Sequence, residues 1–221
     1  MRLLLFTLVS FVVTTMMAQE PIRFLALGDS YTIGESVAEQ DRWPVQLSRL
    51  MQDAGVNLNQ PEIIATTGWT TDELSKAIDD RKPGNDYGLV SLLIGVNNQY
   101  RGNSQEVYVQ EFTALLNRAI EFAGGIKNHV VVVSIPDWGV TPFAADRDRD
   151  KIAEEIDAFN AINRQISESH GVHYVDITPG SRLAKTELDL VAGDGLHPSG
   201  KEYSRWAEKV FEEMRSVYQS K

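Results

Sequence analysis

Residues 21–30 read PIRFLALGDS and point most directly to the architecture of this chain. The apolar run at residues 22–27 has the length of a buried strand, and the glycine and two polar residues after it are typical of a turn. Four more short apolar runs follow, at residues 62–65, 89–94, 129–135 and 172–177. Because such runs alternate with longer segments, they predict an α/β domain with a mainly parallel sheet of five strands.

The segments between the apolar runs have the period of helices. Apolar side chains recur at helical spacing over residues 43–54, 109–122, 152–166 and 203–217. Thr70 with Glu73, and Ser199 with Glu202, have the spacing of a capping box. Because crossovers between parallel strands are right-handed, the helices should cover both faces of the sheet in a three-layer α/β/α sandwich. No Pro/Ser-rich linker interrupts residues 19–221, which are expected to form a single domain.

The first 18 residues have the layout of a secretory signal peptide. Arg2 precedes an apolar run at residues 3–13, and a more polar stretch ends at Ala18, after which cleavage is expected. The alternative is an uncleaved membrane anchor, but the apolar run is well short of the roughly 20 residues that span a bilayer. Residues 19–221 are therefore expected to be secreted or periplasmic, without stable membrane insertion after cleavage.

Composition excludes several classes of protein. The chain has 31 Asp or Glu against 21 Lys or Arg, and the net charge of -10 disfavours binding to nucleic acids or anionic lipid surfaces. It has no cysteine, which excludes disulfides, thiolate metal sites and a cysteine nucleophile. His170 and His173 have no evident third ligand, so no metal site is expected. Acidic residues within 144–157 alternate with basic ones and indicate a solvated helix start.

Polar residues follow the predicted strands, on the loops where open parallel sheets bind their ligands. In chain order these loops contain Gly28-Asp29-Ser30, Thr67-Gly68-Trp69, Gly95-Val96-Asn97-Asn98, Pro136-Asp137-Trp138-Gly139 and Asp194-Gly195-Leu196-His197-Pro198. Each motif alone is a weak signal. Together they place a hydroxyl, a side-chain amide, a glycine turn and an Asp/His pair at one edge of the sheet.

This set of groups favours acyl transfer through a serine. A serine hydroxyl needs an imidazole to remove its proton and a carboxylate to hold that imidazole in the correct tautomer. Ser30, His197 and Asp194 fit these roles. The backbone N–H groups of Ser30 and Gly68 and the side-chain amide of Asn97 could form an oxyanion hole. The alternative interpretation treats Ser30 as a helix N-cap and Asp194 as a turn residue.

The same residues resemble the motifs of the SGNH hydrolases, the GDSL lipase/esterase group. Gly28-Asp29-Ser30-Tyr31 resembles the first block of that family, Gly68 the second, Gly95-x-Asn97 the third and Asp194-x-x-His197-Pro198 the last, in the family's order.

This resemblance implies a flavodoxin-like fold, ester or thioester substrates, and no metal or organic cofactor. It also implies a catalytic triad of Ser30, Asp194 and His197, with Ser30, Gly68 and Asn97 as the oxyanion hole. Two positions differ, because Tyr31 stands where the family name has Leu, and Asn98 where the family usually has Asp. Asn98 can still accept a hydrogen bond but carries no charge.

The substrate pocket is expected at the same strand ends. Its candidate lining residues are Trp69, Asn98, Tyr100, Asp137 and Trp138, with Phe143 nearby. Aromatic rings there could stack on sugars or contact an acyl chain. The sequence therefore predicts an exported serine esterase for short-chain acyl esters or acetylated carbohydrates. It leaves a lysophospholipase, a thioesterase and a non-catalytic carbohydrate-binding module on the same fold as alternatives.

Overall fold

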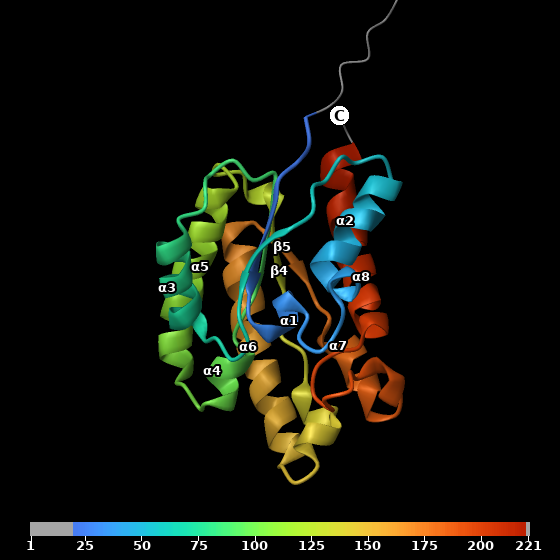
Figure 1. The fold of residues 1–221 in the computed structure, drawn as a ribbon. Coiled ribbons are helices and arrows are strands. Elements are labelled where there is room, and N and C mark those ends of the chain that lie inside the picture. The colour runs from blue at the N-terminus through green and yellow to red at the C-terminus, as the bar shows by residue number, and fades with distance from the viewer. Residues whose placement is uncertain (1–19, 220–221) are drawn as a thin grey trace, which may run out of the picture.

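The computed structural model describes residues 20–219, and these residues form a layered α/β structure (Figure 1). The predicted signal peptide and its cleavage site lie outside the described residues. Among the described residues, no helix is both long enough and apolar enough to cross a membrane.

The described residues form one sheet of five parallel strands, as the sequence predicts. The strands are β1 (Phe24–Gly28), β2 (Glu62–Ala65), β3 (Leu89–Leu93), β4 (Val130–Val133) and β5 (His173–Val175). Their order is β2-β1-β3-β4-β5, and every neighbouring pair is parallel. This is the flavodoxin-like order, in which the chain reverses its direction of travel across the sheet between β1 and β3.

The last two strands are shorter than their apolar runs because burial continues after strand pairing ends. Ile135 and Ile177 follow β4 and β5 and are fully buried, although neither pairs in the sheet. A run of apolar residues indicates burial, whereas a residue belongs to a strand only if it is hydrogen-bonded to a neighbouring strand.

Helices cover both faces of the sheet and complete the three-layer sandwich. On one face α2 (Trp43–Asp53) packs against α8 (Gly200–Gln219), and on the other lie α3 (Thr71–Arg81), α5 (Gln105–Phe122) and α6 (Arg149–His170) (Figure 1). Shorter helices are α1 (Ser30–Ile33), α4 (Val96–Tyr100) and α7 (Thr178–Ser181). Single turns of 3₁₀ helix lie at Glu39–Asp41, Lys127–His129, Trp138–Val140, Pro142–Ala144, Arg182–Lys185 and Leu188–Leu190.

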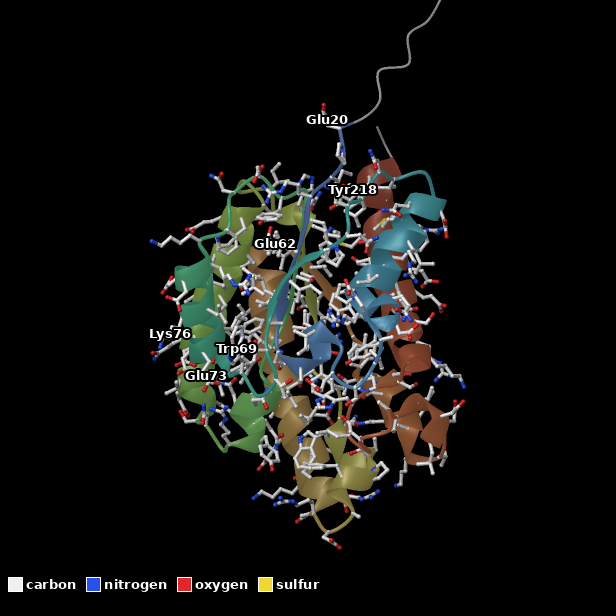
Figure 2. All side chains as sticks on the ribbon, viewed as in Figure 1. Glu20, Glu62, Trp69, Glu73, Lys76 and Tyr218 are labelled. Carbon is white, nitrogen blue, oxygen red and sulfur yellow. The ribbon has the colours of Figure 1, made fainter. Side chains whose placement is uncertain are left out.

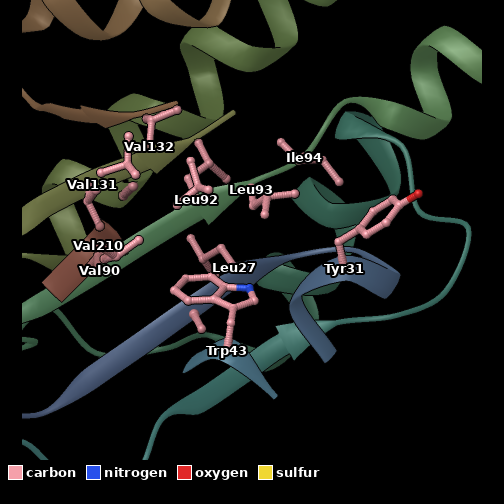
Figure 3. Close-up of a cluster of buried hydrophobic side chains, with 14 of the residues drawn as sticks. Leu27, Tyr31, Trp43, Val90, Leu92, Leu93, Ile94, Val131, Val132 and Val210 are labelled. Carbon is pink, nitrogen blue, oxygen red and sulfur yellow. The ribbon is translucent and has the colours of Figure 1, made fainter. Parts of the chain in front are cut away.

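The core lies between the sheet and each helical layer. Trp43 of α2 and Leu27 of β1 are fully buried in one cluster, together with Val210 of α8 and Val90 of β3 (Figure 3). Burial of each such side chain contributes about 1.5–3 kcal/mol. Tyr31 lies at the end of this cluster and is only 3% exposed, so the core reaches the residue that follows Ser30.

The caps predicted from the sequence are borne out once in full and once in part. Thr70 and Glu73 form a complete capping box at the start of α3. At α8 the hydroxyl of Ser199 accepts the N–H of Glu202 at 3.4 Å, but the Glu202 side chain accepts instead from the indole N–H of Trp206 at 2.8 Å. Glu202 is buried, so its carboxylate points into the fold rather than back along the helix.

Side chains fill the space between the ribbons along the whole molecule (Figure 2). Glu20 and Tyr218 lie at the top of that view, and Trp69 and Glu73, beside the start of α3, lie well below them. Because all five strands are parallel, the loops that follow them lie at one end of the sheet, toward α4 and α7 in Figure 1.

Candidate active site

Ser30 is presented by a sharp turn from β1 into α1. Gly28 ends the strand, and a Cβ at this position would lie 2.4 Å from the carbonyl oxygen of Leu93, so only glycine fits. Asp29 caps the helix, because its side chain accepts the backbone N–H of Tyr31 at 3.0 Å. Ser30 is thereby fixed at the first position of α1, and it is 4% exposed.

The structure brings Ser30, His197 and Asp194 together from opposite ends of the chain. Ser30 Oγ lies 2.9 Å from His197 Nε2, and His197 Nδ1 lies 2.6 Å from Asp194 Oδ2. A carboxylate can only accept, so Nδ1 holds the ring proton and Nε2 is left to accept the serine hydroxyl. The imidazole is therefore in the tautomer that can remove the Ser30 proton.

The Asp194 carboxylate is held by several donors. Its Oδ1 accepts the backbone N–H groups of Leu196 and His197 at 2.9 and 3.0 Å, and its Oδ2 also accepts the Ser36 hydroxyl at 2.7 Å. Burial raises the pKa of Asp194, but the hydrogen bonds from Ser36, His197 and the backbone outweigh it and leave that pKa well below its usual value. Asp194 therefore stays ionised at neutral pH.

Ser30, Gly68 and Asn97 line one cavity. Gly68 has a φ of +86°, a conformation that favours glycine. One hydrogen of the Asn97 amide donates to the Trp69 carbonyl at 2.9 Å, which leaves its second hydrogen for another acceptor. The two loops that follow β2 and β3 are thus tied together beside the Ser30 hydroxyl.

The cavity has a volume of about 170 Å³ and largely apolar walls. Its lining residues are Ser30, Tyr31, Thr67, Gly68, Val96, Asn97, Tyr100, Trp138, Phe143, Leu196 and His197. The Tyr100 and Trp138 rings meet edge to face with their centroids 5.3 Å apart, and Phe143 is 45% exposed at their side. An apolar cavity with a few convergent polar groups suits a small organic substrate.

Of the pocket residues expected from the sequence, the structure places Tyr100 and Trp138 on the wall but not Trp69, Asn98 or Asp137. Trp69 packs against the core, and its carbonyl rather than its ring faces Asn97. Asp137 is 2% exposed, caps the N–H of Gly139 at 2.9 Å and pairs with Arg182. Some side chains of a loop face the cavity and others face the core, and the residue types alone do not show which direction each one takes.

Asn98 is fully buried and holds the start of α3. Its Oδ1 accepts the N–H of Thr71 at 3.2 Å, and its Nδ2 donates to the Thr71 hydroxyl at 2.7 Å. That hydroxyl in turn donates to the carboxylate of Glu111. Because an aspartate has no proton to donate, only an amide at this position leaves the Thr71 hydroxyl free for Glu111. Asn98 thus makes a contact that an aspartate at this position could not make.

Several residues around the site were not predicted to have a role there. Tyr31, Val96 and Leu196 line the cavity, but the sequence motifs that contain them were interpreted through their neighbours. Ser36 contacts Asp194 although no motif includes it. In the described part of the chain, no group of three or more His, Asp or Glu residues is placed to hold a metal ion.

Comparisons with known proteins agree with the motifs and the fold. The profile of the GDSL-like Lipase/Acylhydrolase family matches residues 26–205. No curated protein matches the sequence.

Solved structures resemble this one in fold at low sequence identity. A family 3 carbohydrate esterase from Clostridium thermocellum has a TM-score of 0.68 at 18% identity, over 90% of this chain and 100% of that one. A member of the lipolytic protein G-D-S-L family from Veillonella parvula has a TM-score of 0.66 at 18% identity, over 86% and 97%. An acetylxylan esterase from Geobacillus stearothermophilus has a TM-score of 0.63 at 18% identity, over 87% and 94%.

Proposed function

Because the chain belongs to the GDSL-like lipase/acylhydrolase family and is therefore a carboxylic ester hydrolase, we propose that it acts through an acyl-enzyme formed on Ser30. The observation that carries this proposal is the unbroken line of hydrogen bonds from Ser30 Oγ through His197 to Asp194, with distances of 2.9 and 2.6 Å. The alternative interpretation, in which Ser30 serves only as a helix cap, would not require an imidazole in this tautomer beside it.

The reaction then has two halves. Ser30 Oγ attacks the carbonyl carbon of the ester while its proton passes to His197 Nε2, and Asp194 stabilises the imidazolium through Nδ1. The tetrahedral intermediate collapses, and His197 returns the proton to the departing alcohol. A water molecule next attacks the acyl-enzyme, with His197 again as the base, and releases the carboxylic acid and free Ser30.

The oxyanion of each tetrahedral intermediate needs fixed donors. The backbone N–H groups of Ser30 and Gly68 and the free hydrogen of the Asn97 amide supply them in this proposal. All three residues border the cavity, and losing one such donor typically costs about 3 kcal/mol of barrier.

The substrate is a short-chain acyl ester, and an acetylated carbohydrate is the candidate that we favour. The cavity of about 170 Å³ is small and apolar, which suits an acyl group of few carbons. The exposed rings of Tyr100 and Phe143 at its edge suit stacking on a sugar face. The resemblance in fold to a carbohydrate esterase and an acetylxylan esterase supports this choice.

The proposal includes export. The leader at residues 1–18 supports secretion or delivery to the periplasm, and removal of Arg2 would make the remaining chain still more acidic than the net charge of -10. An acidic enzyme outside the cell is better suited to neutral esters than to anionic polymers or anionic membrane surfaces.

The test is hydrolysis of nitrophenyl esters with graded acyl length, beside acetylated saccharides and a lysophospholipid, by the wild type and Ser30→Ala. We expect the highest kcat/KM on acetyl or similarly short esters, and no turnover by a Ser30→Ala variant with an unchanged Tm. Faster turnover of long acyl chains or of the lysophospholipid would replace the substrate proposal with the lysophospholipase alternative. Full activity in Ser30→Ala would refute the mechanism.

A further inference from the structure

We propose that Glu35 and Ser36, two consecutive residues in the turn after α1, are positioning residues of the active site. Ser36 holds the carboxylate of Asp194, and Glu35 holds the loop that contains Gly68. This inference rests on the proposed roles of Ser30, His197 and Asp194.

The turn is attached directly to the nucleophile. The carbonyl oxygen of Ser30 accepts the backbone N–H of Gly34 and also that of Glu35, the latter at 3.0 Å. Gly34 has a φ of +68°, and a Cβ there would lie 2.4 Å from Cγ of Arg42. Only glycine allows the chain to turn back at this point, so the positions of Glu35 and Ser36 are fixed relative to Ser30.

Ser36 contacts the catalytic carboxylate at the cost of a strained backbone. Its hydroxyl donates to Asp194 Oδ2 at 2.7 Å, the same oxygen that accepts His197 Nδ1. Its φ is +66°, and Lys82 is the one other non-glycine residue with positive φ in the described part of the chain. A serine in the left-handed region is disfavoured, and such strain is retained where the surroundings require it.

The contact of Ser36 with Asp194 matters because this carboxylate is not enclosed. The Asp194 side chain is 30% exposed, whereas His197 is 8% exposed. Without Ser36, water would compete for Oδ2 on the side away from the imidazole. A hydroxyl at 2.7 Å instead fixes the carboxylate so that its lone pair points at Nδ1.

Glu35 acts on the other side of the site. Its carboxylate accepts the hydroxyl of Thr67, the residue before Gly68 and itself part of the cavity wall. The two contacts therefore connect the turn after α1 to loops 32 and 158 residues further along the chain. One short turn thus sets the Gly68 loop and the Asp194 loop relative to Ser30.

The positioning role predicts a loss in kcat that does not follow the loss of stability. Ser36→Ala removes the hydroxyl and keeps the strain, whereas Ser36→Gly removes both. We expect kcat to fall roughly tenfold in each variant, with KM within about twofold of the wild type, because a hydrogen bond to a charged group is lost. The Tm of Ser36→Ala should fall, because this variant loses the hydrogen bond and keeps the strain, and the Tm of Ser36→Gly should be higher than that of Ser36→Ala, since glycine relieves the positive φ.

Two control variants test whether the same changes lower kcat when they are made far from the active site. Lys82→Gly relieves the other positive φ, and Ser169→Ala removes an exposed serine hydroxyl at the end of α6. Both variants should retain the wild-type kcat. For Glu35, Glu35→Ala should lower kcat roughly tenfold, whereas Glu35→Gln keeps an oxygen that accepts the Thr67 hydroxyl and should recover most of the activity.

The outcomes distinguish this inference from the proposed function. If Ser30→Ala is inactive while the Ser36 variants and Glu35→Ala keep the wild-type kcat, the positioning role is wrong and the serine mechanism stands. If Ser30→Ala is active, both are wrong. A kcat loss that follows Tm, with equal losses in Lys82→Gly and Ser169→Ala, would also overturn the positioning role.

Discussion

Asn97 and Asn98 are neighbours in α4 but have different surroundings. The same substitution should therefore affect catalysis at one position and stability at the other. Asn97 borders the cavity and has one amide hydrogen free for the oxyanion. Asn98 is fully buried and bonds twice to Thr71. We expect Asn97→Ala to impair catalysis with little loss of stability, and Asn98→Ala to impair stability with little change in kcat.

The magnitudes follow from what each side chain touches. Loss of one oxyanion donor raises the barrier by about 3 kcal/mol, so Asn97→Ala should lower kcat roughly a hundredfold or more. Its lost bond to the partly exposed Trp69 carbonyl costs about 1 kcal/mol of stability at most. Asn98→Ala loses two hydrogen bonds and leaves the buried N–H of Thr71 unpaired, which together cost about 3 kcal/mol, or roughly 6–12 °C in Tm.

Steady-state kinetics on an acetyl ester and thermal unfolding of the same preparations measure both quantities. The two variants should exchange rank between the assays, with Asn97→Ala slowest and Asn98→Ala least stable. A kcat for Asn97→Ala above about half of the wild-type value, or a Tm for Asn98→Ala equal to that of the wild type, would refute these assignments.

Three further perturbations test other parts of the structure. Burial raises the pKa of Asp29 to about 7, whereas the unfolded chain releases this proton at about pH 4. Between these pH values the native state binds a proton that the unfolded state does not, so the stability should fall as the pH rises. Asp29→Asn should remove this fall; urea unfolding at about pH 5 and about pH 8 checks it, and an equal difference from the wild type at both values contradicts it. Phe143→Ala opens the cavity wall, so the ratio of kcat/KM for a hexanoyl over an acetyl ester should rise several-fold; an unchanged ratio would place the acyl chain elsewhere. Arg182→Ala leaves the buried carboxylate of Asp137 unpaired and should cost about 3 kcal/mol in urea unfolding, whereas Asp157→Asn, at the exposed partner of the same arginine, should cost less than about 1 kcal/mol. Equal losses in the last two variants would show that burial does not decide the effect.

The sequence predicted the sheet and the gathering of polar groups because both depend on local patterns. Apolar runs such as residues 89–94 report burial, and the loops after parallel strands must meet at one edge of the sheet. The positions of Ser30 and His197 followed from these two facts, although 167 residues separate them.

The direction of individual side chains could not be predicted in the same way. Successive residues of a helix differ by about 100° in direction. The family motif Gly95-x-Asn97 singled out Asn97, but nothing in the sequence showed that Asn98, also expected in the pocket, would lie in the core. Asp137 was expected in the pocket because it follows a strand, but its partner Arg182 is 45 residues away in the sequence.

Ser36 was missed for a different reason. A glycine at residue 36 would have signalled a left-handed backbone, whereas a serine with φ of +66° gives no such signal. The structure shows both the positive φ of Ser36 and the hydrogen bond to Asp194 that explains it.

The central claim is that His197 activates Ser30 as a nucleophile, and covalent labelling tests it most directly. The wild type is incubated with an activated alkyl phosphonate, and the adduct is located by mass spectrometry of peptides, with a folded His197→Gln variant as the control. We predict one adduct, on Ser30 of the wild type, formed in step with the loss of esterase activity, and none on the variant in the same time. An adduct on another residue, or complete inactivation with Ser30 unmodified, would contradict the account.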